Sequence, residues 1–170
     1  MHAKRSTLTS TLLICLAGLA GILLAPAASA QSLDTFMRID GIPGDSLANG
    51  HVNDIVLTSY SQSFAPGKNC SKVVAQKFMD RASPALIGRA AGNLILPAVI
   101  ISIRKSSGVP FDFYRAVLES VSIERVDVSG ESGRLIEQII LRPRNIRIEL
   151  RQQDATGAPG PAIVTNIDCT

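Results

Sequence analysis

Apolar residues recur at every second position along most of the chain from Leu33 onward, and short clusters of Gly, Pro, Asn and Ser interrupt them. Successive side chains of a β-strand point to opposite faces, so this period of two predicts short strands. We expect seven to nine of them, near residues 33–39, 54–64, 72–79, 99–103, 111–117, 121–128, 135–141, 145–151 and 163–167. The apolar face moves from odd to even positions near Glu124 and Arg125, which predicts a β-bulge there.

One segment departs from this period. Ser83 offers a hydroxyl that can cap a helix start, and Pro84 follows at the first helical position, where a missing N–H does no harm. Apolar residues then continue to Gly92 and Asn93, which supply a left-handed stop. Many short strands and a single helix predict a mainly β fold, a small antiparallel β-barrel with one short flanking α-helix.

The first thirty residues do not fit this barrel. They begin with basic residues, contain no acid, and continue in an apolar run from Leu12 to Ala25 that is shorter than the roughly 20 residues of a membrane-spanning helix. Small residues follow up to Ala30. This layout predicts a signal peptide over residues 1–30, with cleavage between Ala30 and Gln31. We therefore expect a secreted or periplasmic domain of residues 31–170, with no stable membrane insertion after cleavage; an uncleaved anchor is the alternative.

The charge of the folded domain follows from this division. The whole chain has 17 Lys and Arg residues against 14 Asp and Glu residues, a formal net charge of +3. Lys4 and Arg5 belong to the predicted leader, so residues 31–170 are close to neutral. A domain with so little excess positive charge is not expected to bind nucleic acid. Outside the leader, His51 and two cysteines leave no spacing typical of zinc, so we expect no metal and no cofactor.

Several local sequences resemble those of a known family. They are IDGIPGDS at residues 39–46, KFMDRASPALIGRAAGN at 77–93, PAV and IRK at 97–99 and 103–105, LESV at 118–121, and QDA at 153–155. Their order and spacing, over about residues 33–168, resemble the Hcp family. These haemolysin-coregulated proteins form the inner tube of type VI secretion systems.

The resemblance implies a non-enzymatic small barrel that associates into hexameric rings, which stack into a tube. Members of the family are themselves secreted and carry or chaperone effectors, so further copies of the chain, type VI secretion components and effector cargo are the expected partners. Two features differ from the family pattern: the signal peptide, and the short loop at residues 65–69 where the family often has a long one. They leave a second hypothesis, an exported stand-alone β-barrel binding module that no longer builds a tube.

Cys70 and Cys169 are the two cysteines outside the leader. An even number of cysteines in a chain sent to an oxidising compartment predicts one disulfide, which would enclose nearly the whole barrel and pin the C-terminus beside the start of the third strand. Two unpaired thiols are the alternative, since the sequence does not show proximity. A nucleophilic Cys70 would need an activating partner, for which His51 is the only candidate.

The remaining polar residues give no catalytic pattern. Three aspartates, at positions 40, 45 and 54, lie in or beside turns, where aspartate commonly bonds its own backbone. No serine lies in a GxSxG turn, so a hydrolase ranks last among the hypotheses. Serines at positions 59, 61 and 63 predict a polar strand face toward solvent or a lumen. Four arginines predict a solvated strand face balanced by Glu149, namely Arg142, Arg144, Arg147 and Arg151.

Overall fold

The computed structural model describes residues 33–64, 70, 72–106, 110–131, 133–154, 156 and 158–169. All of them belong to Gln31–Thr170, the second of the two units into which the chain divides. The signal peptide predicted over residues 1–30, its cleavage between Ala30 and Gln31, and the short loop at residues 65–69 lie outside the described residues. They remain predictions.

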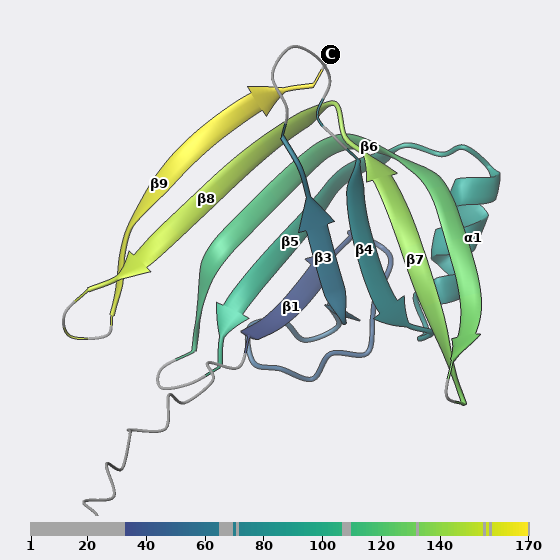
Figure 1. Ribbon diagram of the computed structural model, residues 1–170, viewed down its shortest axis with the longest axis horizontal. Helices are drawn as coiled ribbons and strands as arrows, with labels where there is room; N and C mark the ends of the chain where they lie inside the picture. Colours follow the sequence, from purple (N-terminus) through teal and green to yellow (C-terminus); the bar gives the residue numbers. More distant parts are fainter. Residues whose placement is uncertain are drawn as a thin grey trace, which may run out of the picture. The chain divides into compact units, whose positions relative to one another are not determined.

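The described residues form nine strands and one helix. The helix, α1 (Ser83–Ala91), packs against β6 (Figure 1). A mainly β fold with a single short helix is therefore confirmed. The strands are β1 (Leu33–Arg38), β2 (Ile55–Leu57), β3 (Ser59–Gln62), β4 (Val73–Phe78), β5 (Leu96–Lys105), β6 (Phe111–Glu131), β7 (Arg134–Arg142), β8 (Asn145–Gln153) and β9 (Pro159–Asp168).

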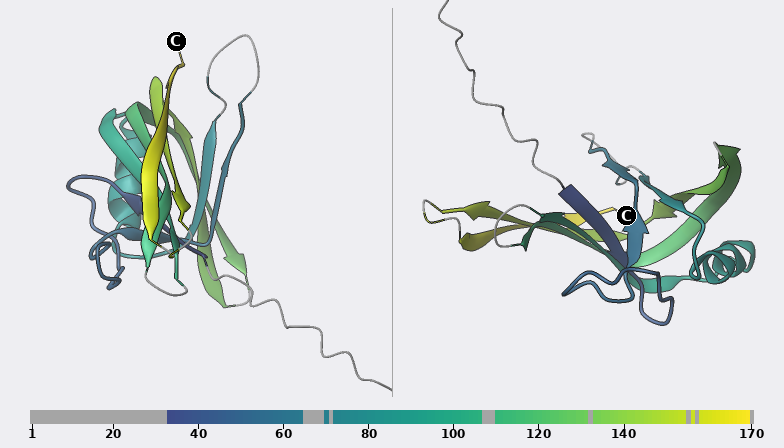
Figure 2. Two further views of the ribbon diagram at one scale, coloured as in Figure 1. Left: turned by 90° about the vertical axis from the view of Figure 1, so that its left-hand side faces the viewer. Right: turned by 90° about the horizontal axis from the view of Figure 1, so that it is seen from below.

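Antiparallel pairing joins the strands into one curled sheet with two halves. One half has the order β2-β1-β5-β6-β8-β9, and the other has the order β6-β7-β4-β3. β6 belongs to both halves: its first part pairs with β5 and β8, and its second part pairs with β7. Its register with β7 shifts between Ile123 and Arg125, which confirms the predicted bulge. The long β6 bends on its way from one half to the other (Figure 2).

The core is one cluster of aliphatic side chains that alternate with exposed ones along the strands. Full burial of one such side chain stabilises the fold by about 1.5–3 kcal/mol. The core is built mainly from these aliphatic side chains, so the small number of Phe and Tyr residues in the chain does not weaken it. Its members that are fully shielded from solvent include Met37, Ile55, Val73, Leu86, Val99, Ile101, Leu118, Val121, Ile139 and Leu141.

Side chains, not strand pairing, close the curl of the sheet between β3 and β6. In the part of the chain that the structure describes, β3 pairs only with β4. The hydroxyl of Tyr60 in β3 lies 3.2 Å from that of Tyr114 in β6, and the two rings are tilted with centroids 6.1 Å apart. Tyr60 also donates a hydrogen bond to the Gln62 side chain. These contacts hold the edge of one half of the sheet against the other half.

This contact makes the fold sensitive to alkaline pH. Burial raises the pKa of Tyr60, and the hydrogen bond to Tyr114 raises it further. Above about pH 10 the unfolded chain loses this proton while the folded chain keeps it, so the free energy of unfolding falls as pH rises. Between pH 9 and pH 11 we expect the wild type to lose about 1 kcal/mol more than Tyr60→Phe. Urea unfolding followed by circular dichroism measures both losses, and equal losses would contradict the contact.

The start of α1 differs from the prediction, whereas its left-handed stop is confirmed at Asn93. Ala82, not Ser83, occupies the N-cap position, and no side chain caps the helix there. Ser83 is buried instead: its hydroxyl donates to Glu137 and accepts from Lys77. At the other end Gly92 is right-handed, with φ −81°, whereas Asn93 has φ 49° and is the left-handed residue. The predicted cap was wrong because a buried ion pair engages the hydroxyl.

Three parts of the predicted strand pattern also differ from the structure. The strands predicted over residues 111–117 and 121–128 are one continuous strand, β6, which extends over Phe111–Glu131. The strand predicted over residues 54–64 is two strands, because the chain leaves one half of the sheet after Leu57 and enters the other half at Ser59. The last strand, predicted over residues 163–167, extends over Pro159–Asp168. Prolines fit in β9 because it is an edge strand, where an N–H group on the free side needs no partner.

Candidate functional site

The hairpin of β8 and β9 forms an arm at one side of the sheet (Figure 1). None of the ten residues in β9 is buried, and eight of them are exposed. Ile163 and Val164 lie on opposite faces of the strand and are 59% and 42% exposed. The free backbone edge of such a strand is a template for pairing with another chain. The arm is therefore a candidate association surface.

β3 is the free edge of the other half of the sheet. Its serines Ser59 and Ser61, together with Ser63 just after it, are exposed, while Tyr60 and Gln62 between them are half-buried. The predicted polar face thus points outward from the curl. Because β3 and β9 are different edges, they offer two different surfaces to neighbouring molecules.

The predicted arginine face is divided among several partners. Arg147 pairs with Glu149 at 2.9 Å, and Arg115 of β6 lies 3.5 Å from the same carboxylate oxygen. Arg142 pairs with Glu124 at 2.9 Å instead. The prediction that Glu149 balances the charge of these arginines is confirmed for Arg147 and is wrong for Arg142.

The other two arginines lie at two different pockets. Arg151 lines an open pocket of about 280 Å³ on the arm, together with Phe111, Arg115 and Pro159. Arg144 lines a second pocket, of about 360 Å³, between the end of β7 and the end of β9. The four arginines therefore do not make one binding face.

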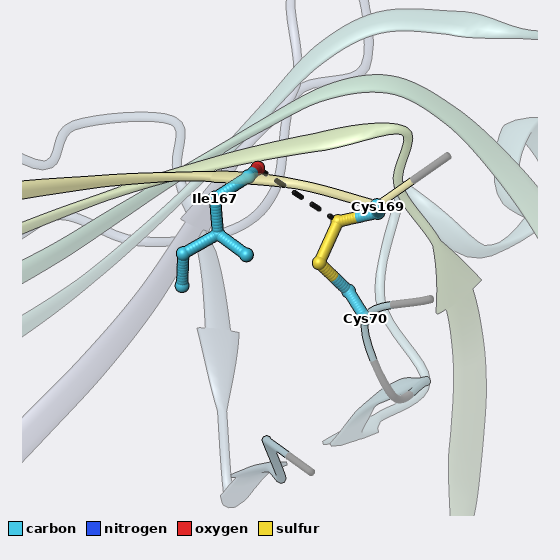
Figure 3. The surroundings of a disulfide bond; sticks show 3 residues. All are labelled: Cys70, Ile167 and Cys169. Atoms are coloured by element: carbon cyan, nitrogen blue, oxygen red, sulfur yellow. Dashed lines mark hydrogen bonds between the residues drawn. A yellow bond between two sulfur atoms is a disulfide. The ribbon is translucent and has the colours of Figure 1, made fainter. Parts of the chain in front are cut away.

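Cys70 and Cys169 form a disulfide in the structure, with their Cα atoms 4.7 Å apart (Figure 3). This distance lies within the range that the bond requires. Cys70 lies shortly before β4 and Cys169 directly after β9, so the bond connects the end of the arm to the other half of the sheet. The backbone N–H of Cys169 donates to the Arg144 carbonyl oxygen at 2.8 Å. The geometry supports the pairing predicted from the sequence.

His51 is held by two carboxylates. Its Nδ1 lies 2.8 Å from Asp54 Oδ2, and its Nε2 lies 2.9 Å from Asp112 Oδ1. The ring is buried, with both nitrogens engaged, so it is not placed to activate Cys70. Asp54 also accepts a hydrogen bond from Arg38 at 2.7 Å. The expectation that the Asp54 side chain bonds its own turn is therefore incomplete, because the side chain links the loop to β1 through Arg38 and also bonds His51.

A second polar cluster lies in the core below α1. Lys77 and Glu137 are direct neighbours across β4 and β7, and both are fully buried, with Lys77 Nζ 2.6 Å from Glu137 Oε2. Lys77 also contacts Asp80 at 2.7 Å, and Ser83 bonds both charged groups. This pair was not predicted from the sequence because sixty residues separate its members. Glu137 in an otherwise apolar strand was the one available signal.

These features can now be placed among known proteins. A protein-family model described as "Type VI secretion system effector, Hcp" matches residues 36–150, which is more than half of the chain. The chain belongs to the Hcp family. This confirms the resemblance seen in the sequence, and it places the protein among the tube and effector proteins of type VI secretion.

Solved structures of Hcp proteins have the same fold. Hcp1 from Salmonella typhimurium is 25% identical, with a TM-score of 0.73 over 81% of this chain and 94% of that one. A type VI secretion system effector from Yersinia pestis is 26% identical, with a TM-score of 0.71 over 79% of this chain and 99% of that one. Hcp2 from Salmonella typhimurium is 25% identical, with a TM-score of 0.68 over 79% of this chain and 95% of that one. The curled sheet is thus the Hcp barrel-like fold.

Three further findings concern this Hcp-family chain, one from a comparison with known proteins and two from its described residues. No protein with a curated description matches it significantly. Among the described residues, no helix is long and apolar enough to cross a membrane. Within the same residues, no group of three or more His, Cys, Asp and Glu side chains could hold a metal ion.

Proposed function

We propose that this Hcp-family chain is a non-enzymatic component of a type VI secretion system that associates into hexameric rings, as a tube component or as a secreted carrier of effectors. The observation that carries the proposal is β9: a ten-residue strand with a free edge and no buried residue. A strand in this position gains most of its stability from a partner. Membership of the Hcp family supports a second copy of the chain as that partner.

The position of the free edges favours a closed ring. β9 and β3 are different edges on different halves of the sheet. If β9 of one copy contacts β3 of the next, the contact is head to tail. Contacts of this kind close into a ring when the rotation between copies allows it. Burial of Ile163 and Val164 in each contact would contribute about 1.5–3 kcal/mol per side chain. A lumen with polar walls would hold cargo weakly enough to release it.

We also propose that residues 1–30 direct export and that the Cys70–Cys169 bond forms in the oxidising compartment reached in this way. The cysteine geometry supports the bond, and disulfides persist in such compartments. The location is testable from the mature N-terminus. A chain that begins at Gln31 in the periplasm or medium agrees with export, whereas a chain that retains Met1 in the cytosol contradicts it.

Placing charges on both faces of β9 is expected to dissociate the ring. In Ile163→Lys/Val164→Lys, two lysines replace the exposed apolar side chains of the arm, so association weakens by about 100-fold or more. Ile87→Lys is the matched control, because Ile87 is 40% exposed on α1, a helix that lies away from the arm (Figure 1). Sedimentation velocity measures the assembly state of the three proteins.

The proposal expects hexamers for the wild type and for Ile87→Lys, and single chains for the double variant at the same concentration. Hexamers of the double variant would show that β9 lies outside the interface. A folded wild type that stays monomeric at high micromolar concentration would contradict ring formation itself.

The disulfide favours one alternative, an exported stand-alone binding module that kept the barrel and lost the tube. A covalent link between the arm and the other half of the sheet stabilises a single subunit without a neighbour. Genomic context separates the two functions. Neighbouring sheath, baseplate and spike genes would agree with tube service, and their absence would agree with the module.

A further inference from the structure

The pocket at the Cys70–Cys169 disulfide gives solvent access to the bond. It has a volume of about 360 Å³, and both cysteines line it together with Ser120, Ser122 and Arg144. Cys70 is half-buried, whereas Cys169 is only 8% exposed. A structural disulfide in a core has no such access. Here Cys70, the more exposed of the two cysteines, lines a hollow of the size that small ligands occupy.

The charged side chains in this pocket are cationic. Two arginines, Arg142 and Arg144, line it, and no carboxylate is among the described lining residues. Arg142 shares its charge with Glu124 at 2.9 Å. Arg144 is exposed, and its backbone is fixed on both sides, by its N–H to the Glu119 carbonyl at 3.0 Å and by its carbonyl to the Cys169 N–H at 2.8 Å. The Arg144 backbone is therefore held beside that of Cys169, and the Arg144 side chain lines the same pocket as the disulfide.

We propose that this pocket is a thiol–disulfide exchange site for anionic low-molecular-weight thiols, which attack Cys70 Sγ and open the bond. The entering thiolate forms a new S–S bond to Cys70, and the Cys70–Cys169 bond breaks with its electron pair on Cys169. Cys169 then takes up one proton. A second thiol attacks the mixed disulfide, which releases Cys70 as a thiol and the small-molecule disulfide as the other product. Two thiols are oxidised and one protein disulfide is reduced.

Two features of the pocket favour this direction of attack. Only the thiolate is nucleophilic, and exchange depends on access to the sulfur under attack and on how well the other sulfur leaves. Cys70 is the more exposed of the two cysteines, and the positive charge of Arg144, which lines the same pocket, favours negative charge on the departing Cys169. Once reduced, the Cys169 thiol has an acceptor in the Ile167 carbonyl oxygen, 4.0 Å from Sγ (Figure 3). Exchange thus frees the end of β9 from the other half of the sheet.

The charge preference is tested on intact oxidised protein with three thiols. Glutathione is anionic, 2-mercaptoethanol is neutral and cysteamine is cationic, and each rate of disulfide opening is normalised to the thiolate concentration. At low salt we expect glutathione to react about three- to tenfold faster than cysteamine, because one nearby guanidinium acts on two units of charge difference. The ratio should shrink in 0.5 M salt, a condition that screens the interaction.

A variant pair assigns the preference to the pocket. Arg144→Gln removes the exposed guanidinium and should lower the glutathione-to-cysteamine ratio at least twofold. Arg151→Gln is the matched control on the arm, at the other pocket, and should keep the ratio of the wild type. Both are exposed side chains, so neither change disturbs the core.

The site of attack is read from the mixed disulfide, trapped with acid and located by peptide mass mapping. We expect glutathione on Cys70. Glutathione mainly on Cys169, opening only in denaturant, or a ratio that neither salt nor Arg144→Gln changes would overturn the proposal. None of these readouts depends on ring formation.

Discussion

Replacing Lys77 by methionine is expected to lower the free energy of unfolding by about 3–5 kcal/mol, the usual effect of removing one partner of a buried ion pair. Glu137 would stay in the core without its counter-charge, since Lys77 Nζ lies 2.6 Å from Glu137 Oε2 and both side chains are fully shielded from water. That loss is a large share of the about 5–15 kcal/mol that stabilises a typical domain. Urea unfolding at fixed protein concentration measures it.

The double variant Lys77→Met/Glu137→Leu is the matched control. Both charges are then absent, and apolar side chains of similar volume fill the site, so we expect a loss at least 2 kcal/mol smaller than for Lys77→Met alone. A single variant that loses less than about 1 kcal/mol would contradict the burial of the pair. The same result would also contradict the buried position of Ser83 at the start of α1, because Ser83 bonds both charged groups.

Removal of the disulfide is the second large effect. In Cys70→Ser/Cys169→Ser the unfolded chain regains the freedom of a loop that spans 99 residues, so the free energy of unfolding should fall by about 2–5 kcal/mol. The longer the loop, the larger the constraint that the bond places on the unfolded chain. Urea unfolding of the oxidised wild type and of the variant gives the difference.

Reduced wild type is the control for the serine substitutions, and it should match the double variant within about 0.5 kcal/mol. If oxidised and reduced wild type unfold at the same urea concentration, the two cysteines are not bridged in the purified protein. That outcome would also remove the basis of the exchange site, while leaving the ring proposal intact.

The sequence predicted the parts of the fold that depend on local pattern. The period of two gave the strands, because half-buried strands place alternate side chains in the core. The change from odd to even apolar positions near Glu124 gave the bulge. A similar change, from Leu57 to Tyr60, marks the break between β2 and β3. The interpretation of that segment as one strand missed it because polar residues surround the change.

The parts that depend on distant residues were not predictable in this way. Lys77 and Glu137 meet through the pairing of β4 with β7, and His51 meets Asp112 across sixty-one residues. No local spacing carries such contacts. The disulfide was the exception, because two cysteines outside the leader leave a single possible pairing within the domain. The extent of β9 was underestimated because its prolines are tolerated only at an edge, and the sequence does not show which strand is the edge.

The mass of the wild-type protein in solution is the direct test of ring formation. Oxidised protein at high micromolar concentration is passed through a size-exclusion column with light-scattering detection, which gives the mass of the species in solution. Ring formation through the free edges of β9 and β3 predicts a mass of six chains. A folded, disulfide-bonded species with the mass of one chain across the whole concentration range would contradict it.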